Sequence, residues 1–427
     1  MASASEGDSR VTRVAVLGGG VVGTTTAYAL AEQGLAVTVI EAREGLGLET
    51  SFANGGLITP SMADPWASPG LPLKLLKWIG REDSPFLIRP SALPGMIGWG
   101  LAFLRNCSET AWRRNTETIF RLADYSQRAL ERIGSEVGLR YDRSTSGTLR
   151  LLRDEAAMAD ALKIAELVGP LGVDYRVLDS EACIALEPSL ADQRDQIHGG
   201  VHYPGDDFGD AHLFTKGLGE RCAELGVQFR FGERVTGFQR DGAGIAAVQT
   251  DKGRVEADAV VLALGVGSVA LARTLGVRLP IYPVKGYSMT LDAAGWNRQP
   301  KIPVIDDNRK MGITPLGDRI RLAGTAEFNG HDTSLNETRN GALLKSFMGL
   351  YPDFPNAGSA QPWAGLRPMT PDGIPILGPC SVPNLYLNVG HGHLGWTLAA
   401  GSARILADLV AGKTPEIDIS DMTLAGR

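Results

Sequence analysis

Three glycines at a fixed spacing near the start of the chain are the first residues whose pattern indicates chemistry. Gly18, Gly20 and Gly23 form G-x-G-x-x-G within RVAVLGGGVVGTTTAYALAEQGLAVTVIEA, which starts at Arg13. In this spacing the first glycine makes a turn, the second lets backbone approach a pyrophosphate, and the third lets helix and strand pack closely. Glu41, near the end of the stretch, can accept hydrogen bonds from ribose hydroxyls. The residues predict a dinucleotide site, for which NAD and FAD are equally suitable.

The segments around these glycines predict a βαβ unit. Residues 14–17 are a short apolar and β-branched run, typical of a buried strand. A helix is expected over residues 21–33, ended by Gly34, and a second strand over 36–40. The start of that helix would favour the negative charge of a phosphate group.

Arg367 is the second residue that indicates a site. It lies in WAGLRPMTPDGIPILG, a segment otherwise short of charge. A buried guanidinium without a partner is costly, so an arginine in such a segment requires an anion. The anion is either a bound ligand or a structural partner such as Asp372 or another acid.

The α/β pattern is interrupted after Glu41 and returns much later in the chain. A proline-rich region follows residue 60, whereas an NAD enzyme of this fold would normally continue with further βα repeats. Strand and glycine-turn patterns reappear over residues 226–240, 253–268 and 385–410, the last containing NVGHGHLGWTLAAG. A discontinuous dinucleotide-binding domain with inserts is therefore expected.

Composition narrows the class of protein. A chain of 427 residues is long enough to form two domains. Its net charge of -6 gives no reason to expect a nucleic acid partner. Four cysteines without a C-x-x-C pair favour a reducing, cytoplasmic compartment and argue against a disulfide framework or a metal site. Residues 1–10 are expected to be a disordered leader, and no apolar run is long enough to span a bilayer.

Four long stretches carry a resemblance to a known family. They read ETSFANGGLITPSMADPWASPGLPLK, PVKGYSMTL, GLRPMTPDGIPILG and GHGHLGWTLAAGSARILADL. The chain resembles FAD-dependent oxidoreductases of the D-amino acid oxidase and glycine oxidase type, and within them most resembles the bacterial D-amino acid dehydrogenases. The resemblance implies an α/β fold: a Rossmann-type FAD-binding domain from residues 11–60, 205–275 and 362–423, and an α+β substrate domain with a mixed or antiparallel sheet from 61–204 and 276–361.

The same resemblance implies a set of residues that bind non-covalent FAD. The late glycine loop would lie against the flavin ring, because glycines have no side chains to clash, and the following helix start would stabilise charge on the reduced ring. The residues expected at the cofactor are Gly18, Gly20, Val21, Val22, Gly23, Glu41, Ala42, Arg43, Thr50, Ser51, Gly55, Gly56, Leu57, Val235, Gly265, Gly390, His391, Gly392, His393, Leu394, Gly395, Trp396 and Thr397.

Three residues are expected to serve the reaction. The resemblance implies that Arg367 binds the substrate carboxylate as a bidentate fork. Tyr287 would line the pocket or hold a substrate oxygen, unless it is a core tyrosine, and His393 would be catalytic unless it only shapes the loop. Relatives place a tyrosine ahead of KMGITPLGDRIRLAG, where this chain has none, so the carboxylate clamp is incomplete or is filled from elsewhere.

The implied reaction is oxidative deamination of a D-amino acid to a 2-oxo acid and ammonia, by hydride transfer from Cα to the flavin. Its electrons would pass to quinone or another acceptor. LPLKLLKWIG (71–80) and the apolar residues 93–104 would rest on the inner face of the membrane, or would be ordinary helices. Oxidation of D-proline, hydroxy-D-proline or sarcosine, and a partner-dependent electron-transfer flavoprotein, remain alternatives, with an NAD-dependent dehydrogenase the poorest of them.

Overall fold

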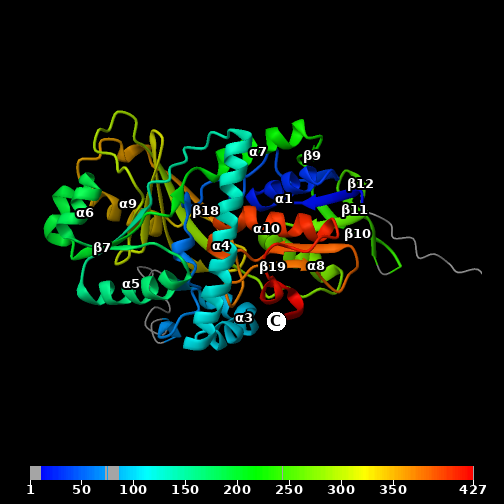
Figure 1. Cartoon of the computed structure of the whole chain (residues 1–427), viewed down its shortest axis with the longest axis horizontal. Coiled ribbons are helices and arrows are strands. Elements are labelled where there is room, and N and C mark those ends of the chain that lie inside the picture. Colours follow the sequence, from blue (N-terminus) through cyan, green and yellow to red (C-terminus); the bar gives the residue numbers. More distant parts are fainter. Residues whose placement is uncertain (1–10, 73–74, 76–85, 243, 427) are drawn as a thin grey trace, which may run out of the picture.

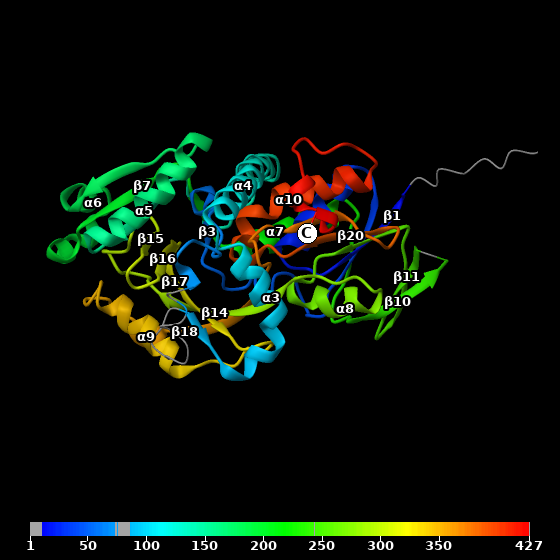
Figure 2. The same ribbon diagram turned by 90° about the horizontal axis from the view of Figure 1, so that it is seen from below.

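The fold is built on two sheets. A computed structural model describes residues 11–72, 75, 86–242 and 244–426. The predicted leader 1–10 and most of LPLKLLKWIG lie outside these residues. Figures 1 and 2 show the two halves side by side, with the long helix α4 (Glu109–Val137) running between them.

The first half contains a six-stranded sheet in which every neighbouring pair is parallel except the antiparallel pair β19 and β20. Along the sheet the strands are β19 (Ile376–Pro379), β20 (Leu385–Val389), β13 (Ala259–Leu262), β1 (Arg13–Leu17), β2 (Ala36–Ile40) and β9 (Gln228–Arg230). Strands far apart in the sequence are therefore neighbours in one sheet. The arrangement confirms the predicted Rossmann-type α/β fold.

Both faces of this sheet are covered, which explains why β1 is an almost continuous apolar run. Val14 and Val16 face the core formed with α1 (Val21–Glu32), α7 (Ala211–Glu224) and α10 (Gly395–Val410). Ala15 and Leu17 face the opposite core. That core is shared with α8 (Ser268–Thr274) and a three-stranded antiparallel sheet of β10 (Val235–Asp241), β11 (Gly244–Thr250) and β12 (Gly253–Glu256).

The second half contains a nine-stranded mixed sheet, where the sequence predicted a mixed or an antiparallel one. Its strands are β18 (Gln361–Met369), β14 (Tyr282–Asp292), β17 (Arg319–Phe328), β16 (Met311–Leu316), β15 (Val304–Asp306), β5 (Thr148–Leu152), β7 (Gly199–Tyr203) and β6 (Arg176–Asp179), with β4 (Phe86–Ile88) added beside β17. α5 (Glu155–Val168), α6 (Ser180–Leu186), α9 (Glu337–Met348) and α3 (Leu93–Arg105) lie around it. Its core centres on residues such as Leu151, Ile313 and Phe347.

Two elements lie elsewhere than the predicted domain segments indicate. β18 falls in the segment 362–423 but pairs with β14 along its whole length, because an antiparallel partner there satisfies its backbone groups. α4 falls in the insert 61–204 but packs on α10, where the amide of Gly401 donates to Ser126 Oγ at 3.0 Å. A short antiparallel pair, β3 (Leu57–Ile58) with β8 (Asp207–Phe208), also forms near the junction of the halves.

Candidate active site

A cavity of about 1050 Å³ extends from the glycine turn after β1 to the wall formed by β14, β17 and β18. Most of the predicted site residues line it. They are Gly18, Gly20, Val21, Val22, Glu41, Ala42, Arg43, Thr50, Ser51, Gly55, Gly56, Leu57, Gly265, Tyr287, Arg367, His391, Gly392, His393, Leu394, Gly395, Trp396 and Thr397. Gly23, Val235 and Gly390 do not line it.

One end of the cavity is lined by the glycine turn and Glu41, the residues predicted to bind the dinucleotide. The Glu41 carboxylate is held by two backbone amides, those of Gly19 and Arg43, each at 2.7 Å. α1 begins at Val21 with neither a side-chain cap nor an acid in its first turn. Among the described residues, the Val21 amide donates to Ser51 Oγ at 3.0 Å and the Thr24 amide to the carbonyl of Gly20 at 2.9 Å, whereas the amides of Val22 and Gly23 have no acceptor. A helix start without a protein anion is suited to a phosphate.

Two glycines of the fingerprint are needed for space and backbone geometry. Gly18 has φ +107°, and a Cβ there would lie 2.6 Å from the carbonyl oxygen of Ala263. A Cβ on Gly23 would lie 1.9 Å from the carbonyl oxygen of Gly18. Gly23 therefore allows helix and strand to pack, which is why it does not reach the cavity.

The late glycine loop lines the cavity from His391 to Thr397. After a turn over Gly392–Leu394, α10 begins at Gly395 without a side-chain cap. The Ser402 hydroxyl donates to the carbonyl of Leu398 at 2.8 Å, so its oxygen accepts from His391 Nε2 at 3.0 Å. Burial lowers the pKa of His391 to about 3, and the ring is neutral at physiological pH.

Arg367 lies in the β18 wall of the cavity without an acidic partner among the described residues. Its Nη1 donates to the carbonyl of Thr325 at 3.2 Å, and its guanidinium lies 5.6 Å from the ring centre of Trp66. In the part of the chain that the structure describes it makes no ion pair, so the expected alternative of a salt bridge to Asp372 is not observed. Burial lowers its pKa only to about 10, which leaves it charged at neutral pH.

Local backbone features make room for Arg367. A Cβ on Gly286, two residues along β14 from the partner of Arg367, would lie 2.4–2.6 Å from three atoms of the guanidinium. β17 bulges at Thr325, whose φ of 55° is rare for a β-branched residue, and the bulge brings its carbonyl to Arg367. A bridge between Met369 and His391 joins the strand of Arg367 to the glycine loop.

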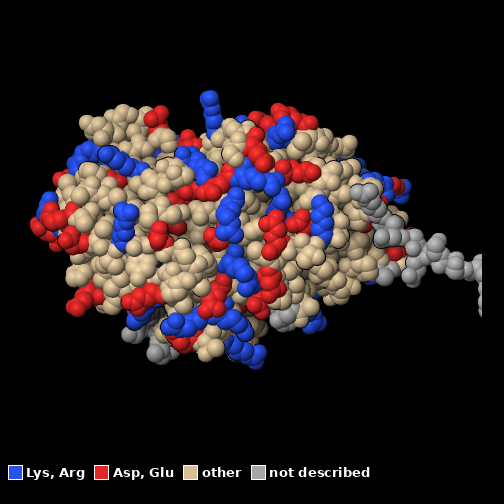
Figure 3. All heavy atoms as spheres, in the orientation of Figure 1, with Lys and Arg blue, Asp and Glu red and all other residues tan. Residues whose placement is uncertain are grey.

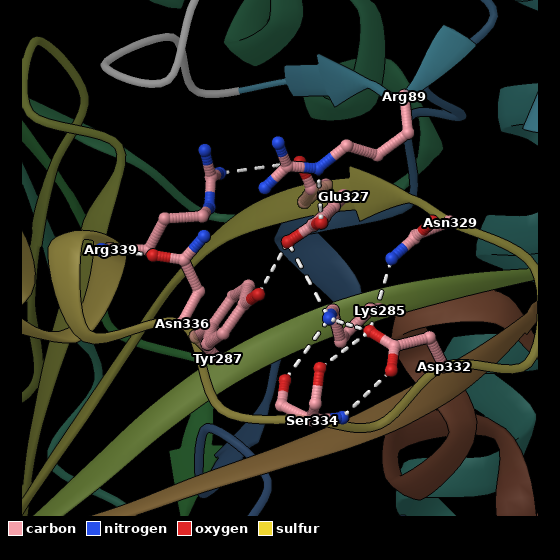
Figure 4. Close-up of polar contacts among 10 residues, drawn as sticks. Arg89, Lys285, Tyr287, Glu327, Asn329, Asp332, Ser334, Asn336 and Arg339 are labelled. Atoms are coloured by element: carbon pink, nitrogen blue, oxygen red, sulfur yellow. Dashed lines mark hydrogen bonds and ion pairs between the residues drawn. The ribbon is translucent and has the colours of Figure 1, made fainter. Parts of the chain in front are cut away.

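Tyr287 lines the cavity, but its hydroxyl is bound by a buried carboxylate. Figure 4 shows it directed at Glu327, to which it donates a hydrogen bond, and the Tyr287 side chain is 1% exposed. Arg89 Nε contacts the same carboxylate at 2.8 Å and Lys285 Nζ at 3.6 Å. Burial alone would raise the pKa of Glu327, but the Tyr287 hydrogen bond and the two cations outweigh it and lower the pKa. The hydroxyl therefore belongs to a buried ionic cluster, which agrees with the expectation of a core tyrosine.

Trp66 is a cavity residue that sequence reasoning missed. Its ring stacks on His393, with centres 5.2 Å apart and an angle of 23°, while Arg367 lies over the ring as well. Burial, and then the charge of Arg367, lower the pKa of His393 to about 3, so this histidine is also neutral. Nothing in the sequence around this single tryptophan, which lies among prolines, indicates that it contacts Arg367 and His393, about 300 residues later.

Lys310, Met311 and Gly312 line the cavity at the place where the resemblance implies a tyrosine that this chain lacks. Lys310 has φ 52° and its Nζ lies 3.9 Å from Asp307, which Arg150 holds at 2.9 Å. The ion pair of Lys310 and Asp307 therefore lies where the resemblance implies a tyrosine side chain.

Comparison with known proteins decides the family. The model of the FAD dependent oxidoreductase family, DAO, matches residues 13–409. The chain belongs to this family. FAD is the dinucleotide of the family, which removes the NAD alternative. The glycine turn, the start of α1 without a cap or an acid, and the Glu41 carboxylate fit FAD, and the same cavity continues to Arg367.

Relatives and solved structures agree with this membership. D-amino acid dehydrogenase of Methylobacterium nodulans is 47% identical, over 96% of this chain and 98% of the relative. D-amino acid dehydrogenase of Granulibacter bethesdensis is 45% identical, over 97% and 99%. The fold is similar to that of glycine oxidase from Bacillus cereus, with a TM-score of 0.74, 22% identity and 97% and 99% coverage. L-proline dehydrogenase from P. horikoshii gives a TM-score of 0.76, 20% identity and 97% coverage of both chains.

Proposed function

We propose that the protein is an FAD-dependent D-amino acid dehydrogenase that converts D-amino acids to 2-oxo acids and ammonia. The observation that carries the proposal is Arg367, a charged guanidinium on the cavity wall with no ion pair among the described residues. Such a group requires an anion, and an amino acid carboxylate matches its fork. The 47% and 45% identical relatives named D-amino acid dehydrogenase support the substrate class.

The chain's own residues bind and orient the substrate in this proposal. Arg367 holds the carboxylate, while Thr325 and Trp66 hold Arg367. Fixing the carboxylate at one end of the molecule limits the positions that Cα can take, which is the main contribution of a protein whose cofactor carries the chemistry.

Hydride transfer suits the residues present. FAD, when bound, supplies the acceptor for the hydride leaving Cα. His391 and His393, with pKa values near 3, are too weakly basic to remove a Cα proton. As the hydride leaves, the neutral amino group donates its lone pair to Cα and forms the C=N bond of an iminium, which water hydrolyses to the 2-oxo acid and ammonium.

A turnover assay tests the proposal. Purified protein is mixed with a redox dye and with D-alanine, other D-amino acids, their L-enantiomers, D-proline or sarcosine, and dye reduction, 2-oxo acid and ammonia are measured. We expect activity with D-amino acids, and its loss in Arg367→Met but not in Arg298→Met, a surface arginine paired with Asp192 and Asp353. Activity with D-proline or sarcosine alone would move the substrate to secondary amines, and no activity would indicate a partner-dependent flavoprotein.

We further propose that the electron acceptor is quinone reached at a membrane surface. None of the helices in the described part of the chain has the length and hydropathy needed to cross a bilayer. α3 instead exposes four large apolar side chains on one face, at a spacing of four, four and three residues. These are Leu93, Ile97, Leu101 and Leu104, with exposures of 44, 61, 55 and 47%.

The position of α3 supports this surface. On the inner side of the helix Trp99 Nε1 donates to the carbonyl of Met369 at 2.9 Å, two residues after Arg367 in the cavity wall. Arg105, Arg113 and Arg114 are exposed nearby, and Figure 3 shows basic side chains on the lower rim where Figure 1 places α3. Anionic lipid headgroups would match these charges.

Sedimentation with vesicles tests the surface. We expect parent protein to bind vesicles of phosphatidylglycerol and phosphatidylcholine, and Ile97→Glu with Leu101→Glu to abolish binding while dye reduction is kept. Each half-exposed side chain contributes on the order of 1 kcal/mol when it enters the interface. Equal binding by parent and double variant would contradict the proposal.

A further inference from the structure

Arg321 is a buried cation that the proposed reaction leaves unused. It lies in β17, is 4% exposed and does not line the cavity. Its Nε donates to Thr290 Oγ1 at 2.9 Å and its Nη1 to the carbonyl of Asn54 at 2.8 Å. In the described residues it has no ion pair, since the nearby Asp210 is taken by Arg319 at 3.0 Å.

The charge of Arg321 persists at neutral pH. Burial lowers its pKa to about 10, with a smaller contribution from Arg319, while Asp210 acts in the opposite direction. A buried guanidinium with only neutral hydrogen-bond partners is costly to fold. Such a residue is expected where its charge serves a second purpose.

The contact with Asn54 places this charge beneath the loop Ala53–Gly56, which lines the cavity. All four carbonyls of the loop are bound from behind. Ser288 Oγ donates to Ala53 at 2.6 Å, Arg321 to Asn54 at 2.8 Å, Thr314 Oγ1 to Gly55 at 2.7 Å and the Gly209 amide to Gly56 at 2.8 Å.

The amides of the loop are left for a ligand. No acceptor within the described residues takes the N–H groups of Ala53, Asn54 or Gly55, whereas the Gly56 amide is bound by Asn54 Oδ1 at 3.0 Å. The carbonyls of Ala53, Asn54 and Gly55 are bound by side chains of the nine-stranded sheet, so the peptide dipoles of this loop add to the charge of Arg321. Both favour negative charge on the cavity side.

We propose that Arg321 is a positioning residue that acts on FAD through the loop Ala53–Gly56. Its charge favours the negative charge that the flavin ring gains on reduction and so makes the ring a better electron acceptor. The inference rests on the ring lying beside Gly55 and Gly56, two of the residues expected at the cofactor. It concerns the cofactor alone and does not depend on which amino acid is the substrate.

The test separates the charge of Arg321 from its hydrogen bonds. Arg321→Gln keeps N–H donors for Asn54 but removes the charge, and Arg321→Lys keeps both. Arg319→Gln, two positions along the same strand, removes a cation that Asp142 and Asp210 neutralise, and is the matched control. The midpoint potential of each holoenzyme is measured by anaerobic reduction in the presence of a reference dye. Its sulfite affinity is measured by titration, because sulfite forms a negatively charged adduct with oxidised flavin.

We expect Arg321→Gln to lower the midpoint potential and to weaken sulfite binding by about tenfold, the effect of one charge at several ångströms in a partly shielded site. Arg321→Lys and Arg319→Gln should remain within threefold of the parent. The proposal would be overturned if Arg321→Gln left both the midpoint potential and the sulfite affinity unchanged. It would also be overturned if Arg321→Gln and Arg321→Met both lost oxidised FAD, because the charge would then serve the binding of FAD and not its reduction. No amino acid is used, so failure of the proposed substrate leaves this result interpretable.

Discussion

Replacing Gly286 with alanine is a direct test of how the structure places Arg367. The added Cβ would lie 2.4 Å from the guanidinium carbon and 2.5 and 2.6 Å from its two terminal nitrogens. An ordinary contact begins near 3.4 Å, so the guanidinium must move by about 1 Å. The hydrogen bond to the Thr325 carbonyl and the contact with Trp66 change with it.

The expected cost follows from this displacement. A shift of about 1 Å in a group that positions substrate typically lowers the rate about 100-fold, or about 2.7 kcal/mol in transition-state stabilisation. We therefore expect kcat/KM for a D-amino acid to fall about 100-fold in Gly286→Ala. Steady-state dye reduction measures it, with flavin content and melting temperature recorded on the same preparation to show that the fold is kept.

Two further variants identify the cause. Gly312→Ala adds the same methyl group to another glycine of the cavity wall, where the nearest atom is 3.8 Å away, and should change kcat/KM less than threefold. If Gly286 acts through Arg367, adding Gly286→Ala to Arg367→Met should cause no further loss. Full activity in Gly286→Ala, or an additional 100-fold loss in the double variant, would refute this reasoning.

Three other predictions concern the same region. His391, whose pKa burial lowers to about 3, stays neutral in the folded protein while the unfolded chain takes up a proton near pH 6.5. The free energy of unfolding should thus fall by about 1.4 kcal/mol per pH unit from this residue as pH drops from 6.5 towards 3, and His391→Gln should remove that slope in urea titrations; an unchanged slope would contradict the burial argument. Lys285→Met leaves Glu327 with one cation fewer in the cluster of Figure 4 and should cost about 3 kcal/mol by urea unfolding, whereas a loss below 0.5 kcal/mol would show that the pair is not needed. Trp66→Leu removes the ring beside Arg367 and should raise KM about tenfold, with partial recovery in Trp66→Phe; equal KM values would show that the ring does not hold the guanidinium.

Local patterns predicted the parts of the site that are formed by adjacent residues. The fingerprint placed the start of α1 at Val21, and the late glycine loop placed α10 directly after it, because the glycine spacing and the apolar run lie within one short segment. The family resemblance extended this to FAD and to Arg367, which the sequence alone left with two possible partners.

The remaining features depend on contacts between distant segments. The bulge at Thr325 depends on the pairing of β14 with β17, in which Gly286 and Tyr287 are consecutive but their partners, Ala326 and Gly324, are not. Trp66 meets Arg367 and His393 from an insert that gives no periodic signal. From the sequence, Tyr287 was equally suitable for contacting substrate and for the core. The hydroxyl binds Glu327, which the paired strand β17 brings beside it.

The central claim is tested most directly by the absorption of bound flavin under anaerobic conditions. D-alanine and L-alanine are added in turn to parent protein and to Arg367→Met, with no electron acceptor present. We predict that the flavin band of the parent is bleached by the D-enantiomer and not by the L-enantiomer, and that Arg367→Met keeps its flavin band but requires at least 100-fold more D-alanine to bleach it. A parent flavin that no D-amino acid bleaches, or bleaching that is unchanged in Arg367→Met, would contradict the account.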